Sequence, residues 1–180
     1  GIANLSLNNT TFSCANVGSN NATLTVTDIY GNTATCAATV TVQDLVAPVA
    51  LCQNLTLQLD NTGNVGITAS QVNNGSSDAC GILNLHIGQA GFTCANVGAN
   101  TVVLTVTDNN GNTSTCSSTV TVQDLVAPSA ICQNVTVQLN SNGNGNITTA
   151  QVNNGSTDAC GIASYSLSNT NFNCSNVNSG

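Results

Sequence analysis

The sequence predicts an all-β fold of tandem immunoglobulin-like β-sandwich repeats, each about 80 residues long and stapled by disulfides. Three observations carry this prediction: an internal repeat, a two-residue alternation of apolar side chains, and a set of cysteines that recurs with the repeat. No segment shows the 3.6-residue period that is typical of an amphipathic helix.

The repeat is visible as identical segments. Residues 42–48 read Val-Gln-Asp-Leu-Val-Ala-Pro and recur without change at 122–128. The stretch Cys-Ala-Asn-Val-Gly beginning at Cys14 returns at Cys94 with the same offset. With the linker as boundary, we expect the C-terminal part of one repeat at 1–43, a complete repeat at 44–123 and the N-terminal part of a third at 124–180.

Alternating apolar residues predict half-buried antiparallel strands in the complete repeat. The residues expected on the inner faces are, in order, Leu55, Leu57 and Leu59; Val65 and Ile67; Leu83, Leu85 and Ile87; Val102, Leu104 and Val106; and Cys116, Ser118, Val120 and Val122. A loop at 108–111 ends in Asn-Gly, which supplies the positive φ that a tight hairpin needs. About seven short strands in such a length are typical of an immunoglobulin-like sandwich.

The charge composition excludes several classes of partner. The chain has no Lys or Arg, seven Asp, no Glu and a net charge of −7. Phosphate backbones and anionic membranes would be repelled, so we expect neither nucleic-acid binding nor direct membrane insertion. No apolar run within these residues is long enough for a transmembrane helix. Without Lys there is no amine for an isopeptide bond, so covalent reinforcement has to come from cysteine.

The cysteines indicate disulfides in an oxidising, extracellular compartment. The complete repeat holds Cys52, Cys80, Cys94 and Cys116, without a Cys-x-x-Cys pair of the kind that binds zinc. In an immunoglobulin-like sandwich the first and last strands run parallel, which favours Cys52 with Cys116. That pairing leaves Cys80 with Cys94. Its copy in the third repeat joins Cys160 to Cys174.

A competing arrangement joins Cys36 to Cys52 and Cys116 to Cys132 across the linkers. The preferred bridge from Cys52 to Cys116 closes a long loop and should stabilise the fold by about 4 kcal/mol. It requires a bulge near Gln53, because Cys52 is out of step with the alternation that begins at Leu55.

A run near the end of the repeat resembles a known family. Residues 107–116 read Thr-Asp-Asn-Asn-Gly-Asn-Thr-Ser-Thr-Cys, and the junction carries Asp-x-x-Ala-Pro. These features resemble hyalin-type (HYR-like) repeats, and are most similar to those of very large surface adhesins of gliding Bacteroidetes. The resemblance implies a bacterial cell-surface location, export across the outer membrane by type IX secretion, and a role in cell adhesion or gliding motility.

Candidate chemistry is sparse, and we predict that the chain is not an enzyme. His86 is the single imidazole, and the equivalent positions are Ser6 and Ser166. A repeated active site therefore cannot use His86 as its base. The one cofactor considered is calcium, with Asp44 and Asp108 expected at the same pole of the repeat. The loop beginning at Asp108 lacks the glycine at its sixth position that an EF-hand loop requires.

Two functions remain open on the sequence. In the first, the repeats form a structural stalk or filament of a surface adhesin; their partners are neighbouring repeats, and a tip outside these residues contacts polysaccharide. In the alternative, the repeats themselves bind polysaccharide or another surface ligand. The stalk is favoured because sugar sites commonly use aromatic platforms, and only Phe12, Tyr30, Phe92, Tyr165 and Phe172 are aromatic.

Overall fold

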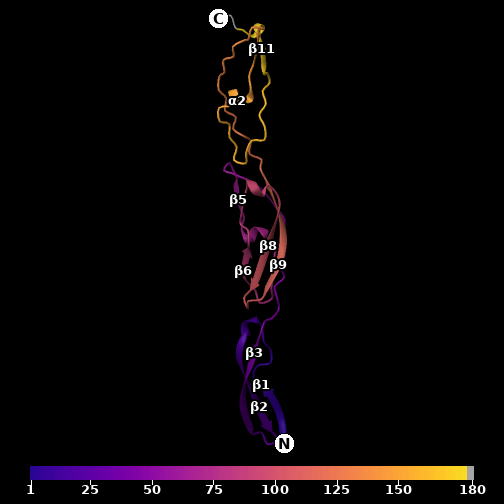
Figure 1. Cartoon of the computed structure of the whole chain (residues 1–180). Coiled ribbons are helices and arrows are strands. Elements are labelled where there is room, and N and C mark those ends of the chain that lie inside the picture. Colours follow the sequence, from indigo (N-terminus) through magenta and orange to yellow (C-terminus); the bar gives the residue numbers. More distant parts are fainter. Residues whose placement is uncertain (178–180) are drawn as a thin grey trace. The chain divides into compact units, whose positions relative to one another are not determined.

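The computed structural model describes residues 1–177 and is mostly β-structure (Figure 1). The strands are β1 (Ile2–Leu7), β2 (Gly18–Asp28), β3 (Thr33–Val42), β4 (Leu55–Gln58), β5 (Asn64–Gly66), β6 (Ile82–Ile87), β7 (Gly91–Thr93), β8 (Gly98–Asp108), β9 (Thr113–Gln123), β10 (Asn144–Asn146) and β11 (Asn171–Asn173). The helical elements are single turns: η1 (Cys14–Asn16), α1 (Ala69–Val72), η2 (Cys94–Asn96), α2 (Thr149–Val152) and η3 (Cys174–Asn176).

The sheets confirm an all-β chain and recur along it. The N-terminal segment, residues 1–43, forms a three-stranded sheet of order β1-β2-β3. The central segment, residues 44–123, forms a four-stranded sheet of order β4-β9-β8-β6. Ile2 pairs with Asp28 in the first sheet, and Ile82 pairs with Asp108 in the second. The two registers therefore coincide when one segment is shifted along the sequence by the offset between the two linker copies.

A parallel pair closes the central sheet. β4 runs parallel to β9, with Leu55 opposite Val120, while β6 runs antiparallel to β8. This parallel arrangement of the first and last strands is the one that the sequence predicted. A separate two-stranded sheet pairs β5 with β7, and β10 pairs with β11 in the same way in the C-terminal segment, residues 124–177.

The well-packed core lies in the central segment. Of the ten buried apolar side chains among the described residues, nine lie there: Leu59, Ile67, Val72, Phe92, Val102, Leu104, Val106, Val120 and Val122. Several belong to the inner faces expected from the alternation. Leu83 is an exception, because a bulge between Ile82 and Asn84 breaks the alternation and leaves its side chain 66 % exposed.

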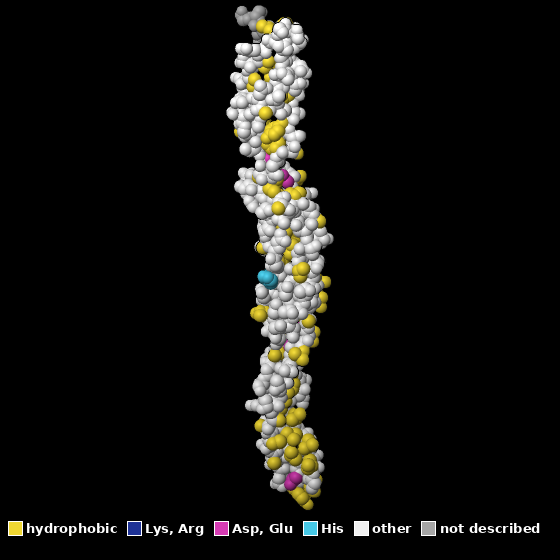
Figure 2. Space-filling view, viewed as in Figure 1, with side chains coloured by type: hydrophobic (Ala, Val, Ile, Leu, Met, Phe, Trp, Pro, Cys, Tyr) yellow, Lys and Arg dark blue, Asp and Glu magenta, His cyan; other side chains and the backbone are white. Residues whose placement is uncertain are grey.

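The N-terminal segment has counterparts of β6, β8 and β9 but buries less. Figure 2 shows apolar side chains on its surface. Ile2, Leu5 and Leu7 of β1 are exposed, whereas Ile82, Leu85 and Ile87, their equivalents in β6, are half-buried. The described residues 1–43 form a single three-stranded sheet.

Contacts divide the chain into two compact units. The first comprises Gly1–Gln53, Thr68–Gly88 and Thr101–Ser118; the second comprises Asn54–Ile67, Gln89–Asn100 and Thr119–Gly180. Each unit contains one copy of the Asp-Leu-Val-Ala-Pro linker. Among the described residues, no helix is long and apolar enough to cross a membrane.

Burial predicts unequal effects of one substitution at two equivalent positions. Leu104 is completely buried, and Leu24, its equivalent in the N-terminal segment, is only half-buried. We expect Leu104→Ala to lower the free energy of unfolding by about 3–5 kcal/mol, and Leu24→Ala by about 1 kcal/mol, because the second leaves a smaller cavity. Urea denaturation followed by circular dichroism measures both. Equal losses would show that the core is not concentrated in the central segment.

Candidate functional site

One predicted disulfide is confirmed. Cys52 is bonded to Cys116, with their Cα atoms 5.8 Å apart. Cys52 is out of step with the alternation of apolar residues that begins at Leu55. Gln53 and Asn54 accommodate this difference, because they precede β4 without being part of it. Ser118 Oγ donates to Gln53 O over 2.6 Å, and Thr119 N donates to Asn54 Oδ1 over 2.8 Å. Hydrogen bonds that involve side chains thus replace regular backbone pairing with β9 at Gln53 and Asn54, just before β4 begins.

The other predicted disulfides are wrong. Cys80 is bonded to Cys14, and Cys94 is bonded to Cys160, so Cys80 and Cys94 do not pair with each other. Cys174 is a free, exposed thiol, and the predicted bridge to Cys160 is therefore absent. The competing bridges are wrong as well: Cys36 and Cys132 are free, while Cys52 and Cys116 bond to each other.

The physical reason is the structure between Cys80 and Cys94. This stretch is not a short closed loop, because it contains β6 and β7, which pair with different partners, β8 and β5. Each of the two cysteines instead meets a cysteine from the far side of a linker. Both bridges have a sequence separation of 66 residues and a Cα–Cα distance of 5.1 Å.

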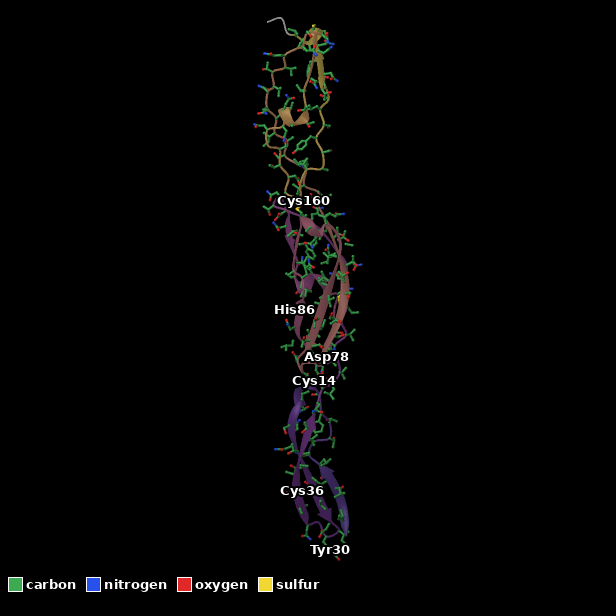
Figure 3. The ribbon with its side chains drawn as sticks, in the orientation of Figure 1. Cys14, Tyr30, Cys36, Asp78, His86 and Cys160 are labelled. Atoms are coloured by element: carbon green, nitrogen blue, oxygen red, sulfur yellow. A yellow bond between two sulfur atoms is a disulfide. The ribbon has the colours of Figure 1, made fainter. Side chains whose placement is uncertain are left out.

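The first junction, formed by the linker at 43–48 and the residues that contact it, lies within the first compact unit. Figure 3 labels Cys14 and Asp78 of this junction. Cys14 opens the turn η1, and Cys80 follows Asp78, whose Oδ1 accepts a hydrogen bond from Cys80 N at 2.7 Å. Asn109 Nδ2 donates to Cys80 O over 2.7 Å. A β-carbon on Gly81, which has φ +94°, would lie 2.7 Å from that same nitrogen, so the approach requires glycine.

The second junction, around the linker at 123–128, lies within the second compact unit and depends on Gly63. This residue has φ +77° in the turn between β4 and β5. A β-carbon there would lie 2.6 Å from Cys94 Sγ and 3.3 Å from Cβ of Ala159, which precedes Cys160. The missing side chain therefore makes the space in which Cys94 and Cys160 meet.

An acidic group recurs at both junctions. One ligand atom each from Asp44, Asp78 and Cys80 lies within 4.8 Å of the others, and Asp124, Asp158 and Cys160 repeat the arrangement. Oδ1 of Asp44 accepts a hydrogen bond from Val46 N at 3.0 Å, while its Oδ2 is buried without a hydrogen-bond partner among the described residues. The sulfur atoms belong to disulfides, so the carboxylates supply the remaining donor atoms in each group.

The predicted calcium ligands are not brought together in this way. Asp108 is completely buried, and both of its carboxylate oxygens accept hydrogen bonds from Asn110 or Asn112 within its own loop. Asn112 Nδ2 also donates to the backbone oxygen of Asp44 over 3.2 Å, which places the loop beside the linker. Asp108 thus organises the hairpin, and calcium binding by Asp44 stays a prediction.

The same loop perturbs the pKa of Asp108. Burial alone raises the pKa of a carboxyl group, but hydrogen bonds from the Asn112 side chain and from the Asn112 and Asn110 amides outweigh it. The net result is a pKa below the ordinary value of 3.8. At Asp28, the equivalent position, hydrogen bonds from Asn32 lower the pKa in the same direction.

His86 lies on β6 with its side chain exposed (Figure 3). The exposed Tyr30 and the half-exposed Tyr165 are replaced by Asn110 and Leu85 at the equivalent positions of the central segment.

No family model matches the chain, and no curated protein matches it. The three disulfides indicate an oxidising, extracellular environment.

Two glycine substitutions test the packing of the second bridge. We expect Gly63→Ala to impair closure of the Cys94–Cys160 bridge, because the new β-carbon overlaps a sulfur atom. Gly31→Ala is the matched control, since Gly31 has φ +88° but an added β-carbon there would meet no atom within 4 Å. The control should cost about 1 kcal/mol from backbone strain alone. Thiol titration of the oxidised proteins should find more free thiol in Gly63→Ala only; equal thiol counts would contradict the assignment.

The lowered pKa values predict acid sensitivity. The folded-state pKa values of Asp28, Asp60 and Asp108 lie below the ordinary 3.8. Their contribution to stability is therefore present above about pH 4 and is lost as the pH falls through the folded-state values. The urea concentration at the midpoint of unfolding, measured between about pH 2 and 6, should decrease as the pH is lowered. The decrease should be less steep for Asp108→Asn. An equally steep fall in that variant would show that Asp108 does not contribute.

Proposed function

We propose that the chain is part of an extracellular stalk, built from tandem immunoglobulin-like repeats, that holds an adhesive tip away from a cell surface. The observation that carries the proposal is the pair of disulfides that cross the linkers, Cys14–Cys80 and Cys94–Cys160. A bridge across a linker adds nothing to a binding surface within one domain. It does restrict how far two successive domains can separate, which is the property that a stalk needs.

The sheet topology supports the immunoglobulin-like part of this proposal. A parallel pairing of first and last strands, as in β4 and β9, is a usual feature of such sandwiches, as is the antiparallel neighbour β8. A sandwich also needs a second layer, and in this proposal the separate two-stranded β5–β7 sheet belongs to it. The constant offset between equivalent elements then corresponds to one domain per repeat.

Charge and composition support an exposed, extracellular structure. The absence of Lys and Arg removes every site that a trypsin-like protease would cleave, and the net charge of −7 disfavours association with anionic surfaces. Together with the resemblance to hyalin-type repeats, these properties lead us to propose a bacterial surface adhesin, exported across the outer membrane and used in attachment or gliding. The proposed partners are neighbouring repeats of the same chain.

Direct binding of polysaccharide by the repeats is the weaker proposal. It calls for a surface that recurs with the repeat, commonly one with aromatic platforms. The 84 % exposed Tyr30 is replaced by Asn110 in the central segment. The other tyrosine, Tyr165, corresponds to Leu85 and Leu5. Neither position can therefore give the same sugar contact in each repeat.

Small-angle scattering tests the stalk on this chain and on versions lengthened by one and two copies of residues 44–123. We expect the maximum dimension to grow by a constant increment of about 30 Å per added copy, the length of a strand of roughly 8–10 residues. The reduced proteins serve as controls, and their increments should become smaller and less regular as the linkers loosen. A dimension that stays nearly constant as copies are added would refute the stalk.

A further inference from the structure

The three disulfides form interlocking covalent loops. They enclose residues 14–80, 52–116 and 94–160, so each loop begins inside the one before it. Every backbone bond between Cys14 and Cys160 consequently lies inside at least one loop. Successive loops overlap at 52–80 and at 94–116, while the stretch from Cys80 to Cys94 lies within the Cys52–Cys116 loop alone.

We propose that this interlocking makes residues 14–160 a covalent tether of limited extensibility with a built-in spare connection. The purpose of such a tether rests on the proposed stalk function, whereas its geometry follows from the disulfide pairing alone. The tether has two parts: a short path that carries tension, and a longer path that takes over when the short one is cut.

The short path bypasses most of the polypeptide. Tension entering at Cys14 crosses to Cys80, follows the backbone to Cys94 and crosses to Cys160. Only the backbone from Cys80 to Cys94 is stretched between these points. At about 3.3–3.6 Å per residue, and with two bridges of 5.1 Å between Cα atoms, the stretch from Cys14 to Cys160 extends to about 60 Å. Without the bridges, the same two positions separate to about 500 Å.

The spare path uses the bridge within the central segment. From Cys14 the backbone leads to Cys52, across to Cys116 and on to Cys160. This route is slack while the short path is whole. It becomes the only connection if the backbone is cut between Cys80 and Cys94. The linker-crossing bridges limit extension, and the Cys52–Cys116 bridge prevents loss of the distal part after a single cut.

The absence of basic residues allows a sharp test of this topology. Ala90 is exposed and lies between Cys80 and Cys94, so Ala90→Arg creates the single trypsin site of the chain. Cleavage there gives two fragments of equal length. Only the Cys52–Cys116 bridge joins them, because the other two bridges each lie within one fragment.

The expected result is one band of full size on a non-reducing denaturing gel and half-size fragments after reduction. Adding Cys52→Ser and Cys116→Ser to Ala90→Arg should release the fragments without reductant. As the matched control, Asn61→Arg places the cut in the exposed turn before β5 in the same double-serine background. Those fragments should stay joined, because Cys14 and Cys80 flank the cut. If the Ala90→Arg fragments stay joined in the double-serine background, the proposed topology is overturned.

Force spectroscopy of the chain with native cysteines tests extensibility without relying on a variant that must fold. After complete unfolding under force applied at the termini, the contour length between Cys14 and Cys160 should be about eightfold smaller in the oxidised chain than in the reduced chain. Equal contour lengths would overturn the inference. Neither result depends on adhesion, so a failed stalk test in scattering and a failed tether test in these assays remain distinguishable.

Discussion

The constraint on which the structure depends is the covalent bond between cysteines on opposite sides of each linker. Among the described residues, Ala22 is the only buried apolar side chain outside the central segment. A bridge that spans 66 residues restricts the unfolded chain and contributes about 4 kcal/mol on the chain-entropy model.

Local structure is adapted to that bond at both junctions. Gly63 omits the side chain that would occupy the place of Cys94 Sγ, and Gly81 allows Asn109 to reach the backbone beside Cys80. The polar interactions are adapted to the composition as well. The chain has no Lys or Arg, so aspartates such as Asp28 and Asp108 act as hydrogen-bond acceptors that order hairpin loops.

The sequence predicted the strands and their faces well, since a period of two residues maps directly onto the two sides of a sheet. It failed at Leu83 because a bulge is invisible in an alternation pattern. Cys52–Cys116 was predictable because it follows from the parallel placement of first and last strands. The other bridges were not, and the repeat explains why. Cys14 and Cys94 occupy the same position in successive copies of the repeated sequence, so a bond from Cys80 to either one gives the same pattern along the repeat.

Choosing between those two bonds requires knowing which cysteine lies beside Cys80 in space, and periodicity carries no such information. The acidic group was missed for a related reason. Asp78 and Asp158 recur like the other aspartates, but their proximity to Asp44 and Asp124 arises only when the linker folds beside them. Asp108, chosen because its loop lies at the right pole, uses its carboxylate to order that loop instead.

The most direct test of the central claim is non-reducing peptide mapping of the oxidised chain by mass spectrometry, after digestion with an Asp-directed protease. No Asp lies between Cys80 and Cys94, so this digestion leaves both cysteines on one peptide. The structure predicts that this peptide is joined both to the peptide containing Cys14 and to the peptide containing Cys160. A peptide in which Cys80 is joined to Cys94 would contradict the account, because the bridges would then lie within repeats and leave the linkers without a covalent crossing.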